Sequence, residues 1–206
     1  MSDASAGPWV YLASQSPRRR ELLTQWGVQT RLLLPDPHED AEALEAVRSG
    51  EAPARYVRRV TRHKLAAAQA RLVRRAWPDG PVLCADTTVA LDGDILGKPA
   101  TQAEARRMLQ RLSGRRHQVL TAVALAQRGQ VFEALSRSEV HFAELSQAQI
   151  RRYVATGEPM GKAGAYAIQG LASLWIQRIS GSHSGIVGLP AFETAQVLAA
   201  AGCRLL

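Results

Sequence analysis

Asp86 could do chemistry, because it lies inside the largely apolar run Val82–Leu91. A carboxylate in the middle of such a strand is unfavourable unless it is paired, hydrogen-bonded or bound to a metal. One interpretation is structural: an aspartate at a strand end whose oxygens accept bonds from backbone amides. The other is catalytic, since charged groups in such places often take part in reactions. We favour the catalytic interpretation.

The segment 12–23 combines features of an anion-binding site. A short apolar strand breaks at Ser14 and Ser16, and a helix follows at once, with Pro17 in its first turn and three arginines directly behind. Serine is favoured as an N-cap, and the free N–H groups of a helix start attract anions. The segment is therefore either a phosphate cradle or an ordinary surface helix with solvated arginines, and its local sequence leaves both open.

Two lysines and an acidic loop add further candidates. Lys64 falls on the apolar stripe of a helix predicted at 53–76, so its ammonium group either lies at the rim of the core or enters a phosphate site. Lys98 occupies a turn, and Glu39 belongs to the proline-bearing loop 35–40. By local sequence alone, both are ordinary surface residues.

The loop 157–170 is richer in glycine than a connector needs, and glycine lets backbone amides approach a ligand closely. Gln169, near its end, offers both a donor and an acceptor, which suits the edge of a nucleobase, although a plain turn residue has the same signature. His117 and His183 have no ligand-like neighbours in sequence. We expect a structural role for His117 and a loop position for His183.

Composition limits the class of protein and its partners. The chain has 206 residues, 46% of them hydrophobic, which is enough for a normal core. Its 26 basic and 18 acidic residues give a formal charge of +8, which suits a nucleotide, a phosphate or a nucleic acid. Cys84 and Cys203 have neither a CxxC nor a zinc spacing, so we expect Cys84 to be a reduced core residue. Without a signal-peptide pattern or a membrane-length apolar run, the expected location is the cytoplasm.

Helix and strand signals alternate, which predicts an α/β fold. The predicted strands cover 10–13, 30–34, 82–91, 95–96, 117–126, 131–142 and 174–179. The predicted helices begin after residue 16, cover 53–76, and begin again at the capping signals 101–104 and 146–149 and at Pro190. We expect a disordered N-terminus at 1–8 and a single domain at 9–206.

Five blocks together resemble the Maf family, the septum-formation-inhibitor-like nucleotide pyrophosphatases. The blocks are Leu-Ala-Ser-x-Ser-Pro-Arg-Arg at 12–19, Ala-Asp-Thr at 85–87 with Gly-Lys-Pro at 97–99, Leu-Ser-Gly-x-x-His at 112–117, Gly-Glu-Pro to Ile-Gln-Gly at 157–170, and Gly-Leu-Pro at 188–190. Each block is moderately specific, and their order over about residues 11–198 is strongly so. The resemblance implies a mixed, elongated and twisted sheet flanked by helices, with two lobes around a central cleft.

The resemblance also implies an activity, the hydrolysis of nucleoside triphosphates to nucleoside monophosphate and pyrophosphate with Mg²⁺ or Mn²⁺. Asp86 stands at the family's catalytic position, described as the proton acceptor, and Glu39 matches its acidic loop position, so we expect both to bind the metal. The family's phosphate-contacting positions fall on Ser14, Arg18, Arg19, Lys64, Lys98 and Lys162. A homodimer is implied too, with a nucleotide rather than nucleic acid or a membrane as the partner.

Substrate choice follows from the same resemblance. Arg18, Thr87 and Gln169 match positions linked with the branch that prefers dTTP and UTP. The chain departs from the family at Gly161, where an Asp is usual, and we expect this to change the rate rather than abolish function. The implied role includes clearing modified nucleotides and a link to cell-division arrest. Two other classes stay open: a non-catalytic nucleotide- or nucleic-acid-binding regulator of septation, and a nucleotidyltransferase.

Overall fold

The computed structural model describes residues 7–40 and 43–205, so most of the N-terminal segment expected to be disordered lies outside the described residues. Among the described residues, seven strands form one mixed sheet in the order β2-β1-β3-β5-β6-β7, with β4 beside β3. The strands are β1 (Trp9–Leu12), β2 (Gln29–Leu32), β3 (Val82–Leu91), β4 (Asp94–Leu96), β5 (Arg116–Gln127), β6 (Gln130–Phe142) and β7 (Ile176–Ser180). The helices are α1 (Pro17–Gln25), α2 (Pro53–Arg74), α3 (Gln102–Leu112), α4 (Gln147–Ala155), α5 (His183–Val187) and α6 (Ala191–Ala200). β1 runs parallel to β2 and β3, and the remaining pairs are antiparallel.

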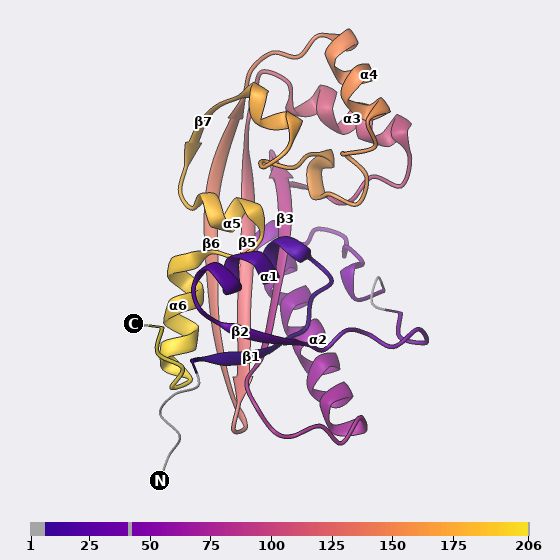
Figure 1. Ribbon diagram of the computed structural model, residues 1–206. Helices are drawn as coiled ribbons and strands as arrows, with labels where there is room; N and C mark the ends of the chain where they lie inside the picture. Colours follow the sequence, from indigo (N-terminus) through magenta and orange to yellow (C-terminus); the bar gives the residue numbers. More distant parts are fainter. Residues whose placement is uncertain (1–6, 41–42, 206) are drawn as a thin grey trace.

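The long strands β3, β5 and β6 run the length of the molecule and connect two lobes (Figure 1). α3 and α4 lie at one end, and α1, α2 and α6 lie at the other. Each lobe has its own apolar core: Leu109 and Ile150 pack with Phe142 in the first, and Leu23 and Leu198 belong to the second. The predicted α/β fold with two lobes is confirmed.

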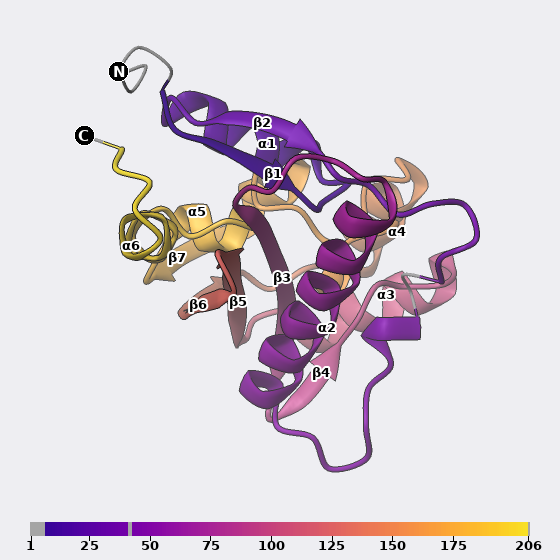
Figure 2. The ribbon, with the colours of Figure 1, turned by 90° about the horizontal axis from the view of Figure 1, so that it is seen from below.

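Helices cover both faces of the long strands (Figure 2). Val60 of α2 packs in one cluster with Ala122 of β5, whereas Leu198 of α6 packs in another with Val123 of the same strand. Successive side chains of a strand point to opposite faces, so this alternation assigns α2 to one face and α6 to the other. The same alternation decides where each side chain of β3 points.

The predicted elements are confirmed where the apolar pattern that predicts them extends over many residues. β3 has the predicted bounds, and Asp92 and Gly93 both have positive φ in the turn that follows it. Four short helical pieces of the described residues were not predicted: the 3-10 turns Ala43–Glu45, Ala163–Ala165 and Leu171–Trp175, and α5. They are three to five residues long, which is too short to show a helical period.

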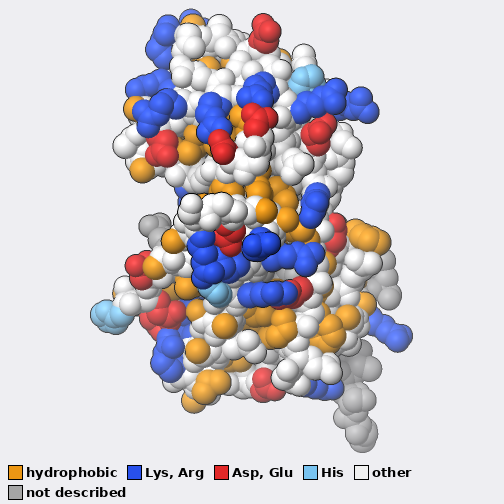
Figure 3. Space-filling model, turned by 180° about the vertical axis from the view of Figure 1, so that it is seen from behind, with side chains coloured by type: hydrophobic (Ala, Val, Ile, Leu, Met, Phe, Trp, Pro, Cys, Tyr) orange, Lys and Arg blue, Asp and Glu red, His pale blue; other side chains and the backbone are white. Residues whose placement is uncertain are grey.

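Seen from the opposite side, the molecule narrows at mid-height, and lysine and arginine side chains gather below the narrowing (Figure 3). On this face, basic side chains also lie on the upper lobe, and those below the narrowing lie close together (Figure 3). In the part of the chain that the structure describes, no helix is both long and apolar enough to cross a membrane.

Candidate active site

Asp86 lies at a gap in one edge of β3. On one side, β3 pairs with β5 from Val82 to Ala90. On the other side, β1 pairs with β3 only at residues 82–83, and β4 pairs with it only at 89–91. Residues 84–88 are thus left with a free strand edge, and a cavity of about 490 Å³ lies against it.

Side chains from both faces of β3 reach this cavity around the free edge. Asp86 points to the face covered by α2 and contacts Lys64 there. Thr87, the next residue, points to the opposite face and meets Arg19 and Thr121. The acidic residue and the arginine-bearing start of α1 therefore line one cavity from the two sides of the sheet edge.

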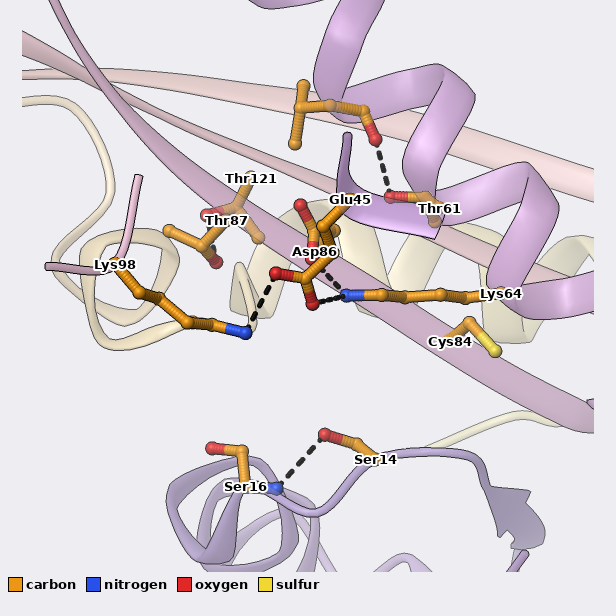
Figure 4. Close-up of polar contacts among 12 residues, drawn as sticks. Ser14, Ser16, Glu45, Thr61, Lys64, Cys84, Asp86, Thr87, Lys98 and Thr121 are labelled. Carbon is orange, nitrogen blue, oxygen red and sulfur yellow. Dashed lines mark hydrogen bonds and ion pairs between the residues drawn. The ribbon is translucent and has the colours of Figure 1, made fainter. Parts of the chain in front are cut away.

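Four charged side chains form a connected row along the cavity wall (Figure 4). Nζ of Lys64 lies 2.5 Å from Oδ1 of Asp86 and 2.7 Å from Oε1 of Glu45. Nζ of Lys98 lies 2.7 Å from Oε2 of Glu45. Carboxylates and ammonium groups thus alternate, and this pairing offsets part of the loss of hydration that burial imposes on Asp86.

The environment of this row shifts the pKa of each group in a way that its contacts explain. Burial raises the pKa of Asp86, which is only 7% exposed, and the positive charges of Lys64 and Arg19 oppose part of that rise. Burial works against the charged form of Lys64, but Asp86 and Glu45 outweigh it and raise the pKa of Lys64. Burial likewise works against ionised Glu45, but Lys64 and Lys98 outweigh it and lower the pKa of Glu45. A carboxylate with a raised pKa is a stronger base, so Asp86 suits a proton acceptor.

The start of α1 forms the cationic side of the cavity. Ser16 holds the predicted N-cap position, but its side chain makes no capping hydrogen bond, and its own N–H donates to Oγ of Ser14 at 3.2 Å. The first amides of α1 are therefore not capped by that side chain, which leaves the helix start attractive to an anion. Arg19 donates to the carbonyl oxygen of Gly188 at 2.8 Å and to Oγ of Ser14 at 3.0 Å. These bonds hold its guanidinium at the cavity, beside Arg18.

The glycine-rich loop 157–170 reaches the cavity from the other lobe. Gly164 donates its N–H to the carbonyl oxygen of Gly97 at 3.1 Å. Its φ of +68° and the 2.9 Å that a Cβ would leave to Val89 both require glycine at this position. This close approach of the two backbones brings Lys162 and Gln169 to the cavity wall.

His117 supports the same loop from inside the core. Its Nε2 and the hydroxyl of Tyr166 lie 2.8 Å apart, and Tyr166 lines the cavity. Burial lowers the pKa of His117 to about 4, so the imidazole is neutral at physiological pH. The structural role expected for His117 agrees with this position.

The structure brings together all the predicted site residues except Glu39. The predicted residues that line the cavity are Ser14, Arg18, Arg19, Lys64, Asp86, Thr87, Lys98, Lys162 and Gln169.

Glu39 is engaged elsewhere. Its Oε1 accepts hydrogen bonds from Arg71 at 3.0 Å and from Arg74 at 2.5 Å. The hydrogen bond from Arg71 is the main reason that the pKa of Glu39 falls to about 2. The carboxylate thus ties the loop 35–40 to α2, and the expected partnership of Glu39 with Asp86 is not formed.

Glu45 is the second carboxylate that contacts Lys64, and it was not predicted from the sequence. It ends the 3-10 turn Ala43–Glu45, and its backbone carbonyl accepts a hydrogen bond from the hydroxyl of Tyr56 at 2.9 Å. That bond holds the turn against α2. No local pattern separates Glu45 from the other acidic residues of this segment, so only the folded chain identifies it.

Asp86 and Glu45 are the carboxylates at the cavity that could share a divalent cation. Over residues 7–40 and 43–205, no three or more His, Cys, Asp or Glu side chains gather as a metal-binding group. Mg²⁺ is commonly held by one or two carboxylates, with waters and substrate phosphates completing its shell. The two carboxylates fit that kind of site, and Glu39 is not among the residues that line the cavity.

The sequence and structure are similar to known proteins. Residues 9–201 match the model of the family described as Maf-like protein. Proteins named dTTP/UTP pyrophosphatase are 59% identical in Polaromonas sp. (strain JS666 / ATCC BAA-500), over 97% of this chain and 99% of that protein, and 62% identical in Burkholderia pseudomallei (strain 1710b), over 96% of each. The solved structure of the Staphylococcus aureus Ham1 protein aligns over 66% of this chain and 72% of that chain, with a TM-score of 0.44 and 13% identity, which is too low to extend the description of the fold.

Proposed function

The chain belongs to the Maf-like family, and we propose that it hydrolyses dTTP and UTP to the nucleoside monophosphate and pyrophosphate. The names of its relatives support this substrate class. The observation that carries the proposal is the placement of Asp86, a buried carboxylate held by Lys64 at a cavity with Arg18 and Arg19 on its wall.

The cationic walls suit a triphosphate. Attack on a phosphorus atom is slow because the surrounding oxygens repel the nucleophile, so catalysis depends on neutralising charge and on positioning. Arg18, Arg19 and the start of α1 supply positive charge from one side of the cavity, and Lys98 and Lys162 supply it from the other. Ser14 keeps Arg19 in place and adds a hydroxyl group beside the helix start.

Asp86 is proposed to accept the proton of the attacking water. Lys64 holds Oδ1 of Asp86, whereas Oδ2 makes no hydrogen bond with the residues that the structure describes. That second oxygen takes the proton as the water attacks the α-phosphorus and the bond to the pyrophosphate breaks. Asp86 and Glu45 are the residues that we propose to hold Mg²⁺ or Mn²⁺, which supplies positive charge to the phosphate oxygens.

Three residues of the cavity are proposed to select the base: Arg18, Thr87 and Gln169. We also propose that the protein works as a cytoplasmic homodimer on free nucleotides. Analytical ultracentrifugation with and without dTTP tests the dimer, since a single monomeric species under both conditions contradicts it.

The decisive experiment measures pyrophosphate release from a panel of nucleotides with Mg²⁺ or Mn²⁺. We expect dTTP and UTP to lead the panel, and Asp86→Asn to lower turnover by at least ~10²-fold, the lower end for a lost general base. Asp94→Asn is the matched control, because that exposed carboxylate pairs with Arg111 outside the cavity.

Mass spectrometry of the products separates the competing classes. Nucleoside monophosphate with pyrophosphate supports the hydrolase. A nucleotide joined to an acceptor indicates a transferase, and tight binding without turnover indicates a non-catalytic regulator. Near wild-type turnover in folded Asp86→Asn would remove Asp86 from the mechanism.

A further inference from the structure

Beneath the cavity, two threonines and a backbone carbonyl form a chain of hydrogen bonds whose direction is fixed. Oγ1 of Thr121 lies 2.7 Å from the carbonyl oxygen of Gly185 and 2.9 Å from Oγ1 of Thr87. A carbonyl oxygen can only accept, so Thr121 must give its single hydroxyl proton to Gly185. The proton between the two threonines must then come from Thr87.

Thr87 consequently has no proton left to donate into the cavity that it lines. The other polar group beside its oxygen is Nη2 of Arg19, at 3.5 Å, and a guanidinium only donates. Every polar neighbour that the structure gives to Thr87 therefore leaves its oxygen an acceptor.

We propose that Thr121 is a positioning residue: it accepts the hydrogen bond that the hydroxyl of Thr87 donates, so that the Thr87 oxygen can only accept a hydrogen bond from a group in the cavity. The cavity then selects a nucleobase with a ring N–H, the imide of uracil or thymine. This inference rests on the proposed function and adds the physical basis of its base selectivity. Thr121 itself is 1% exposed and sits on β5 behind Thr87, so it acts through Thr87 and not on the nucleotide.

The chemistry of a nucleotide decides which of its groups suits such an oxygen. Phosphate oxygens at neutral pH accept hydrogen bonds, so an oxygen without a proton is a poor partner for them. Uracil and thymine carry an N–H at ring position 3, whereas cytosine presents a lone pair at the same position. Thr87 gains a hydrogen bond with the first two bases and meets a second acceptor in cytosine, and mismatched polar groups discriminate strongly.

The carbonyl that starts this chain is itself held in place. Gly185 belongs to α5, and its N–H donates to Oγ of Ser182 at 3.0 Å. Ser182 in turn donates its N–H to Oγ of Ser138 on β6 at 2.9 Å. The short helix is thereby anchored to the sheet, so the direction of the hydroxyl protons is set before any nucleotide binds.

The test compares kcat/KM for UTP and CTP in wild type, Thr121→Val and Thr121→Ser. Valine removes the hydroxyl and frees the proton of Thr87 to point into the cavity, so we expect the UTP to CTP ratio to fall about tenfold, the value of roughly one hydrogen bond. Serine keeps the hydroxyl and is expected to keep the ratio. Thr61→Val is the matched control, because this 1% exposed threonine donates within α2 to Val57 and takes no part in the cavity.

Two outcomes overturn the proposal. One is an unchanged ratio in folded Thr121→Val. The other is an equal loss on UTP and CTP, which would mean that Thr87 contacts the sugar or only supports the fold. If Thr121→Val does not fold, the wild-type enzyme is tested with N3-methyl-UTP against 5-methyl-UTP. The first is expected to be at least about tenfold poorer, and equal rates refute the inference. A wild type that hydrolyses neither UTP nor dTTP contradicts the proposed function instead.

Discussion

Lys64→Met isolates the ion pair that holds Asp86. Nζ of Lys64 bonds both Asp86 and Glu45, so the substitution leaves two carboxylates facing each other without the cation between them. Methionine keeps most of the side-chain volume and can still pack beside the apolar residues of α2. The expected effects are therefore electrostatic rather than steric.

The structure sets the size of the effect on stability. Removing one partner of a buried ion pair costs about 3–5 kcal/mol. The Lys64 and Asp86 side chains are 20% and 11% exposed, and the cavity beside them admits water, which favours the lower end of that range. A loss of about 3 kcal/mol corresponds to a fall in Tm of about 6–12 °C for a chain of this length.

The loss of stability in Lys64→Met should depend on pH, and the direction of this dependence follows from the pKa of Asp86. Burial already raises the pKa of Asp86, and Lys64 is the main influence that opposes the rise, so Lys64→Met raises this pKa further. A carboxyl group whose pKa is higher in the folded state binds more protons there, so its contribution to the free energy of unfolding decreases as pH rises through that pKa. The decrease in the free energy of unfolding of Lys64→Met, relative to wild type, is therefore smallest at acidic pH and grows toward neutral pH.

Thermal unfolding at acidic and neutral pH, together with the pH dependence of kcat/KM, measures both effects. We expect the acidic limb of the activity profile to move to higher pH in Lys64→Met. Arg62→Met is the matched control on the same helix, because the Arg62 side chain is 61% exposed and its pair with Glu133 is expected to contribute about 0–1 kcal/mol. If the two variants have the same Tm and the acidic limb does not move, the reasoning about Lys64 and Asp86 is wrong.

Three further substitutions test the remaining assignments. Glu45→Gln should lower turnover and raise the metal concentration needed for half-maximal rate. Glu39→Gln should mainly lower Tm, since Glu39 holds Arg71. Steady-state metal titrations and calorimetry distinguish these effects, and the reverse pattern would assign Glu39 to the active site. Gln169→Ala should weaken discrimination among dTTP, UTP and CTP more than it lowers kcat; unchanged relative rates would count against base recognition by this exposed amide.

The sequence predicted the elements that carry long signals and the motifs that lie at their ends. β3, the hairpin of β5 and β6, and the start of α1 follow from apolar runs and turn residues. Glu45 could not be predicted, because its place depends on a hydrogen bond from Tyr56, eleven residues away, and on a lysine nineteen residues away. Local composition marks neither glutamate, the family resemblance pointed to Glu39, and tertiary contacts distinguish the two.

The chain of hydrogen bonds from Thr87 through Thr121 to Gly185 could not be predicted from local sequence patterns either. In the sequence, Thr121 is indistinguishable from the other β-branched residues of a buried strand. Its neighbours Thr87 and Gly185 lie thirty-four positions before it and sixty-four after it. The direction of a proton along such a chain depends on which groups can only accept, and that is decided by the assembled fold.

The unpaired stretch of β3 between its contacts with β1 and β4 has a consequence for how a free strand edge is protected. The unpaired N–H and C=O groups of a strand edge can pair with a further strand, and proteins often protect such edges with charged side chains. Here Asp86 lies in the middle of that stretch, with the ammonium group of Lys64 against it. Asp86 is only 7% exposed, so this edge lies inside the fold, and the charged pair occupies the place where a neighbouring strand would otherwise bind.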